Sequence, residues 1–330
     1  MTNGPVDSPG EPFPIDQVPE GSHRPLWSVM IPAYNCAPYL RQTLESVLAQ
    51  DPGPEQMQIE VVDDCSTADD PEAAVREAGR GRVTFYRRPQ NGGVTANFNT
   101  CLQRSCGHLI HILHGDDYVL PGFYVKVAAV AQGHPDVSSF FTRCQIVEED
   151  GTLDWISGPN RHLFQPSHAP GNLLYSNDLR TPGVVVRRSF YETHGGFLPG
   201  LTHVADWEMW VRAISRGGGL FLNELLAAYR FFPNNETGRL ARTAENLRSH
   251  LRLAGIFASQ FKDFDSARFR KSVAQLALQQ EKRFREIGDK EAASSNHRLW
   301  RELTPWILRW EPQFRRLLLS LKQGLASHSP

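Results

Sequence analysis

The chain carries the sequence HLIHILHGDD at residues 108–117, an apolar run that ends in the adjacent carboxylates Asp116 and Asp117. Two earlier apolar runs also stop in polar residues, VMIPAYN at 29–35 and IEVVDD at 59–64. Helical stretches separate the three runs, and an open parallel sheet gathers its ligand site at the carboxyl ends of such strands. Two successive aspartates at that edge suit a hard divalent cation that holds a phosphate. The pattern therefore predicts a nucleotide diphosphate site.

The order of the remaining elements agrees with a layered α/β fold. Strands are expected at residues 27–31, 58–62, 83–86, 108–114, 138–141 and 183–186. Helices are expected from the apolar repeat at 40–48, after Pro71, after the turn at 91–93 and after Pro121. This alternation predicts a mostly parallel, doubly wound sheet flanked by helices. The polar stretch 151–180 is long for a loop without structure, and such loops are usually functional, so it is a candidate cover for the substrate.

Composition and charge divide the chain into regions. Residues 1–25 are rich in Pro, Gly, Asp and Ser and are expected to form a disordered tail. Residues 241–330 hold 17 Lys and Arg against 9 Asp and Glu, whereas the whole chain has a net charge of −1, which gives no argument for nucleic acid. We expect a main domain over 26–237, with halves at about 26–137 and 138–237, and a helical basic extension over 238–330.

The basic extension allows two interpretations. Tryptophans alternate with arginines from Trp300 onward, which is typical of an amphipathic segment at a membrane surface. The same pattern suits a helix that packs on the main domain or on another subunit. The five cysteines are widely spaced without a Cys-x-x-Cys pattern, and no secretory signal or spanning segment is evident. The sequence predicts a cytoplasmic protein, with contact at the inner membrane face as an option.

The motifs together resemble glycosyltransferase family 2, the inverting enzymes of GT-A fold. The resemblance covers about residues 27–230 and rests on IPAYN at 31–35, VVDDCST at 61–67, NGG at 91–93, GDD at 115–117, GGF at 195–197 and DWEMW at 206–210. It implies a Rossmann-like, mostly parallel central sheet with a C-terminal helical extension. It also implies transfer of one sugar from a nucleotide-activated donor to an acceptor hydroxyl in glycan or polysaccharide assembly. Among acceptors, a lipid-linked glycan is one option.

The resemblance assigns roles that agree with the chemistry of each side chain. Asp64 matches the aspartate that accepts from the imide N–H of the donor base, which favours UDP or dTDP. Successive residues on a strand point oppositely, so Asp117 rather than Asp116 is predicted to bind Mg²⁺ or Mn²⁺. Asp206 is predicted to take the acceptor proton as the catalytic base. Helix caps or turns are the competing roles for all three. The remaining residues expected to bind the donor are Pro32, Tyr34, Asn35, Asn91, Gly93, Asp116 and Arg230.

The chain departs from the family pattern at two positions. Phe232 stands where a histidine that assists the metal or diphosphate is common. Because this histidine is replaced, Arg230 is expected to bind the phosphate instead. Ala205 stands where an acidic neighbour of the base is common. Because of these two departures, a second interpretation stays open, in which the chain is a degenerate, non-catalytic protein that binds nucleotide-sugars or acts as a scaffold. His111 and His114 would face opposite sides of one strand, which argues against a zinc site between them.

Overall fold

The computed structural model describes residues 10–232 and 236–304. The chain divides into two compact units, Met1–Phe232 and Pro233–Pro330, and each is described by itself. The boundary falls near the predicted end of the main domain at residue 237. Over the described ranges, no helix is long and apolar enough to cross a membrane.

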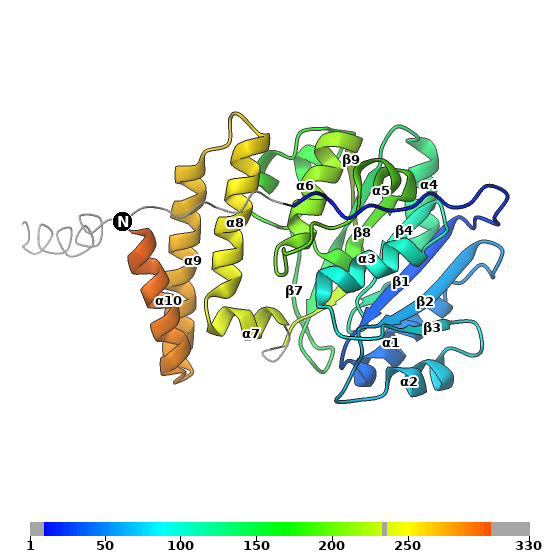
Figure 1. Cartoon of the computed structure of the whole chain (residues 1–330), viewed down its shortest axis with the longest axis horizontal. Helices are drawn as coiled ribbons and strands as arrows, with labels where there is room; N and C mark the ends of the chain where they lie inside the picture. The colour runs from blue at the N-terminus through cyan, green and yellow to red at the C-terminus, as the bar shows by residue number, and fades with distance from the viewer. Residues whose placement is uncertain (1–9, 233–235, 305–330) are drawn as a thin grey trace, which may run out of the picture. The chain divides into compact units, whose positions relative to one another are not determined.

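The first unit is built on one mixed sheet, confirming the predicted α/β fold (Figure 1). Among the described residues its strand order is β3-β2-β1-β4-β8-β6-β9-β5, with β7 added to β6. The strands β1 to β4 are mutually parallel, whereas β8 runs antiparallel to both β4 and β6. The bounds are β1 Trp27–Ala33, β2 Met57–Asp63, β3 Thr84–Arg87, β4 Leu109–Ile112, β5 Tyr118–Val119, β6 Ser139–Val147, β7 Leu153–Ile156, β8 Val184–Arg187 and β9 Gly219–Arg230.

Helices cover both faces of the parallel half because its strands are apolar on both faces. Val29 and Ile31 of β1 pack with Leu40 and Leu44 of α1, while Met30 faces the other way, toward Cys101 of α3. Figure 1 shows α3 in front of these strands. The helices of this unit are α1 Ala37–Leu48, α2 Pro71–Ala78, α3 Val94–Arg104, α4 Phe123–Gly133, α5 Arg188–His194 and α6 Ala205–Gly217.

Local signals set several helix starts. Asp70 accepts a hydrogen bond from the Ala73 amide, and Pro71 follows it at the first helical position, where a missing N–H costs nothing. The helix expected after Pro121 begins two residues later, at Phe123, because the left-handed Gly122 stands between them. The predicted α2 is thus confirmed closely, and α4 with a small shift.

Two expected irregular regions are ordered in the structure. Residues 10–25, predicted to belong to a disordered tail, form an extended segment that packs on the rest of the first unit. Ile15 is buried, the Phe13 carbonyl accepts from the Gly196 amide, and the Asp16 carbonyl accepts from Arg188. The stretch 151–180 contains β7 and the 3₁₀ turns η1 Arg161–Leu163 and η2 Gly171–Leu174, and η3 Thr181–Gly183 follows it.

The second unit is helical, as predicted for the extension. Its helices are α7 Glu236–Arg242, α8 Glu245–Gln260, α9 Ser266–Glu286 and α10 Lys290–Leu303. Asp265 and Asp289 cap α9 and α10 by accepting from backbone amides three residues on. The tryptophan-rich segment beyond residue 304, on which the membrane interpretation mainly rests, lies outside the described residues.

Candidate active site at the carboxyl edge of the sheet

The three loops singled out from the sequence meet at the carboxyl edge of β1, β2 and β4. The Asp64 amide donates to the Ala33 carbonyl at 2.8 Å, and the Gly115 amide donates to the Pro32 carbonyl at 3.1 Å. These bonds extend the parallel pairing of β1 with its neighbours past the ends of the strands. The segments 32–35, 64–67 and 113–117 therefore line one edge.

Asp64 organises the loop 91–93. Its carboxylate accepts from the Gly92 amide at 3.0 Å, from the Gly93 amide at 2.8 Å and from the Arg88 guanidinium, while Asn91 donates to the Asp64 carbonyl at 3.0 Å. Gly93 has φ +81°, a conformation that favours glycine, and it precedes α3. A carboxylate offers about four acceptor positions. Three are taken here, so one acceptor position of this buried carboxylate has no partner among the described residues.

Three neighbouring residues that were predicted to bind the donor have different positions in the structure. Asn35 adopts φ +49°, and its Oδ1 accepts from the Thr67 and Ala68 amides at 2.9 Å, so it fixes the next loop. Pro32 is buried. Tyr34 is 49% exposed, which leaves its ring available to a ligand.

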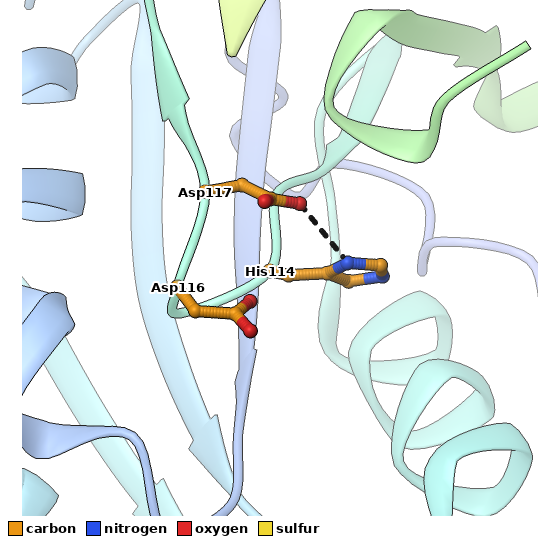
Figure 2. Close-up of side chains that lie close together, drawn as sticks. All are labelled: His114, Asp116 and Asp117. Atoms are coloured by element: carbon orange, nitrogen blue, oxygen red, sulfur yellow. Dashed lines mark ion pairs between the residues drawn. The ribbon is translucent and has the colours of Figure 1, made fainter. Parts of the chain in front are cut away.

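His114, Asp116 and Asp117 form a cluster whose ligand atoms all lie within 4.8 Å of one another (Figure 2). Asp117 Oδ2 lies 3.1 Å from His114 Nδ1. Neither that oxygen nor His114 Nε2 has a hydrogen bond of good geometry within the described residues, although both atoms are buried. Two carboxylates and an imidazole with buried, unsatisfied atoms are a donor set that fits a divalent metal ion.

This cluster corrects two sequence arguments. Asp116 and Asp117 were expected to point oppositely along a strand, but β4 ends at Ile112 and residues 115 and 116 form a turn before β5. His114 also lies beyond the strand, which brings it to the carboxylates. His111 behaves as expected of a satisfied histidine, because it is fully buried and contacts the Tyr124 hydroxyl at 3.2 Å and the Pro182 carbonyl at 3.0 Å.

The electrostatics of the cluster favour a cation. Burial and the adjacent charge of Asp117 raise the pKa of Asp116 to about 6, although His114 and Arg230 oppose the shift. Burial lowers the pKa of His114, but the carboxylates of Asp117, Asp116 and Asp206 outweigh burial and leave that pKa above its usual value. The carboxylates of Asp116, Asp117 and Asp206 thus concentrate negative charge around His114.

Arg230 occupies a structural position rather than an open phosphate site. Its backbone amide donates to Asp117 Oδ1 at 2.8 Å, and its Nε donates to the Asp116 carbonyl at 3.0 Å. The rest of the guanidinium donates to the Glu149 carbonyl and to Gln42, and the side chain is nearly fully buried. Its donors therefore hold the turn 115–117, and the predicted contact of Arg230 with phosphate finds no support here.

Asp206 lies in the first turn of α6. Val204 occupies the N-cap position, so the competing cap role does not apply to Asp206. Its Oδ1 accepts from the Trp207 amide at 2.7 Å, and among the described residues its Oδ2 has only long contacts of 3.5 Å, with Asn177 and Thr181. The side chain is half-buried. One oxygen is therefore weakly engaged and available to a proton donor.

The remaining motif residues support this helix. Glu208 is buried and pairs with Arg212 at 2.8 Å, and Arg212 also donates to the Gly196 carbonyl at 2.7 Å. Asn99 bonds both the amide and the carbonyl of Phe197. These contacts connect the GGF motif to α6 and α3, so Glu208 acts in the scaffold.

A carboxylate-lined edge on a sheet with a parallel first half is the arrangement expected of an enzyme of the GT-A glycosyltransferase class. The family model described as glycosyl transferase family 2 matches residues 28–192. Since the match covers half of the chain, the protein belongs to that family and is a glycosyltransferase, which confirms the resemblance seen in the sequence.

Individual proteins agree with this assignment. The chain is 27% identical over 217 residues to the putative teichuronic acid biosynthesis glycosyltransferase TuaG of Bacillus subtilis, covering 64% of this chain and 81% of that protein. S. aureus TarS 1–349 in complex with UDP-GlcNAc superposes with a TM-score of 0.53 at 16% identity, over 85% and 93% of the two chains. The mannosyltransferase PcManGT of Pyrobaculum calidifontis, solved with GDP-Man and Mn²⁺, gives 0.54 at 17% identity, over 96% and 85%. At these identities the two structures establish the fold alone.

Proposed function

We propose that this protein is a metal-dependent inverting glycosyltransferase that moves one sugar from a nucleoside diphosphate sugar to an acceptor hydroxyl in polysaccharide assembly. The observation that carries the proposal is the His114–Asp116–Asp117 cluster at the carboxyl edge. The negative charge of Asp206 also acts on His114 in this cluster. UDP-GlcNAc in TarS, GDP-Man with Mn²⁺ in PcManGT and the naming of TuaG as a teichuronic acid biosynthesis glycosyltransferase support the same chemistry.

For the donor base, we propose that Asp64 accepts the imide N–H at its remaining position while the Tyr34 ring lies against the base. A carboxylate only accepts, so uracil and thymine present the matching donor. UDP or dTDP sugars remain our preferred donors. Gly93 and Asn91 act through the loop that Asp64 orders.

For the metal, we propose that Asp116 is the principal carboxylate ligand, in place of the Asp117 predicted from alternation along a strand. Asp117 Oδ1 is committed to the Arg230 amide, whereas no hydrogen bond to another described residue holds the half-buried Asp116 side chain. His114 and Asp117 Oδ2 complete the donor set. An imidazole beside carboxylates suits Mn²⁺ better than Mg²⁺, which prefers oxygen ligands. A bound divalent ion neutralises charge on the diphosphate as it leaves.

For the acceptor, we propose that Asp206 Oδ2 takes the proton of the attacking hydroxyl. Inversion needs a base on the side of the sugar opposite the leaving phosphate. The backbone amide of Trp207 holds the other oxygen, which fixes the orientation of the carboxylate. This residue is the same base that the sequence predicted.

Calorimetry with UDP, dTDP and GDP tests the donor site, with Mn²⁺ or with chelator. We expect one nucleotide to bind with Mn²⁺ and to lose affinity in chelator and in Asp116→Asn. Asp136→Asn removes one exposed carboxylate elsewhere and serves as the matched control. Binding of none of the three nucleotides would favour the degenerate, non-catalytic alternative, for which the packing of Phe232 on Tyr39 is the supporting observation.

A further inference from the structure

The loop region that follows β6 brings an arginine and two aromatic rings together near Asp206. The Arg180 guanidinium carbon lies 5.8 Å from the centre of the Trp155 ring and 6.0 Å from that of Tyr229. Trp155 belongs to β7, and Tyr229 belongs to β9. Elements far apart in the sequence therefore build one surface around Arg180.

Arg180 is connected to the proposed base through one residue. Its Nη1 donates to the Asn177 carbonyl at 2.8 Å and to the Leu179 carbonyl at 3.3 Å. The Asn177 amide group contacts Asp206 Oδ2 at 3.5 Å, and Thr181, next to Arg180, contacts the same oxygen. A ligand group at Arg180 therefore lies on the Asp206 side of the site.

The charge of Arg180 is not compensated by a carboxylate. No acidic side chain in the described parts of the chain forms an ion pair with it, and its hydrogen bonds within those parts use Nη1 alone. The other arginines near the edge are engaged, Arg88 with Asp64 and Arg230 with the turn 115–117. A half-buried guanidinium with free donors is suited to bind a carboxylate or phosphate in two-pronged fashion.

Trp155 presents an apolar platform beside that cation. All residues of β7 are exposed, and Trp155 itself is 45% exposed between Asp154 and Ile156, the latter 40% exposed. An exposed aromatic group beside a ligand site is more informative than scattered apolar residues on a surface. A sugar ring has a C–H face that packs on an indole, and Trp offers this area at little cost in conformational entropy.

We propose that Trp155 and Arg180 form an acceptor subsite for an acidic sugar, whose ring lies on Trp155 and whose carboxylate or phosphate binds Arg180. This inference rests on the proposed function, since it concerns the acceptor side of the same site. Uncompensated positive charge beside an aromatic platform is complementary to an anionic glycan and selects it over a neutral one. The occupant is thus the anionic end of the acceptor.

Binding of two methyl glycosides to the full chain tests this subsite, with UDP and Mn²⁺ present. The probes are methyl β-D-glucuronide and methyl β-D-glucoside, measured by saturation-transfer NMR and tryptophan fluorescence. We expect the glucuronide to bind about tenfold tighter, since a hydrogen bond to a charged group is worth that much or more. Arg180→Gln should remove the preference, and Trp155→Ala should weaken both glycosides while Trp155→Phe retains them.

Arg161→Gln is the matched control, because it removes an exposed arginine of the same loop region and should retain the preference. Thermal midpoints of the variants exclude misfolding. Equal affinity of the wild type for both glycosides would overturn the proposal. A loss of UDP affinity in Arg180→Gln would also overturn it, because the anion at Arg180 would then be the donor diphosphate. Failure of the wild type to bind nucleotide, with the glucuronide preference retained, would instead refute the proposed function and leave the acidic-sugar subsite standing.

Discussion

Replacing Asp116 by Asn should stabilise the metal-free protein and destroy its response to metal. Burial and the charge of Asp117 raise the pKa of Asp116 from 3.8 to about 6. In the folded state the ionised carboxylate is therefore disfavoured, and the native protein binds more protons than the unfolded chain between these pH values. Stability falls as the pH rises from about 4 to about 6, and the loss persists at higher pH.

The size of the effect follows from this shift. A shift of about two pH units corresponds to about 3 kcal/mol, at about 1.4 kcal/mol per unit. Solvent screening of the half-buried side chain reduces this, so we expect a gain of about 1.5 to 3 kcal/mol for Asp116→Asn at pH 7 in chelator. The gain should fall to about 0.5 kcal/mol or less at pH 4, where the native carboxyl is protonated and the unfolded one partly so.

Urea and thermal unfolding with chelator, and again with excess Mn²⁺, measure both effects. Ligand at about 100 times its Kd stabilises by about 2.7 kcal/mol, which the wild type should gain and Asp116→Asn should not. Asp117→Ala is the contrasting variant. It leaves the buried Arg230 amide without its acceptor and should cost about 1 to 3 kcal/mol. The reasoning is refuted if Asp116→Asn is less stable than the wild type in chelator at pH 7, or if Mn²⁺ stabilises both equally.

Three further predictions concern the base, the scaffold and a buried histidine. Asp206→Asn should lower the rate of sugar transfer by about 10² to 10⁴-fold with unchanged nucleotide affinity, measured by single-turnover kinetics and calorimetry; weaker nucleotide binding would place Asp206 on the donor instead. Glu208→Gln should cost about 3 to 5 kcal/mol in urea unfolding, because it leaves the Arg212 guanidinium buried without its anion; a change below 1 kcal/mol would contradict this role. Burial lowers the pKa of His111 from 6.5 to about 3, so its contribution to stability is complete above pH 6.5 and is lost as the pH falls toward 3. Between pH 6.5 and 5.5 the wild type should lose about 1 kcal/mol more than His111→Gln, and parallel pH profiles of the two proteins would refute it.

The parallel half of the sheet was predictable because local sequence determines it. Apolar runs alternate there with helical repeats, and Asp70 with Pro71 marks a helix start that the structure reproduces. Those signals act over a few residues and need no knowledge of the partner strand. The site loops followed, since carboxyl ends of parallel strands share one edge.

The second half was less predictable because long-range pairing determines it. The strand β9, with the sequence GLFLNELLAAYR, was not expected, and its register with β6 shifts near Arg143. Leu and Ala carry little preference for strands, so tertiary packing decides this element. Arg180, Asn177 and Trp155 were missed for the same reason. Their roles depend on which residues the region 151–181 brings beside Asp206, and sequence spacing does not give that.

The two halves meet at Asp117, which explains why the site combines predictable and unpredictable parts. Its Oδ2 faces His114, two residues beyond β4, while its Oδ1 holds the amide of Arg230 at the end of β9. The Arg230 side chain then contacts the carbonyls of Asp116 and Glu149 and the amide group of Gln42 in α1. We therefore expect a change in charge at the cluster to act through Arg230 on the strand that carries Tyr229, whose ring centre lies 6.0 Å from the Arg180 guanidinium carbon. Buried polar networks are strong only when every polar group in them has a partner. We therefore expect a bound metal ion to order the donor side and the acceptor side of the site together.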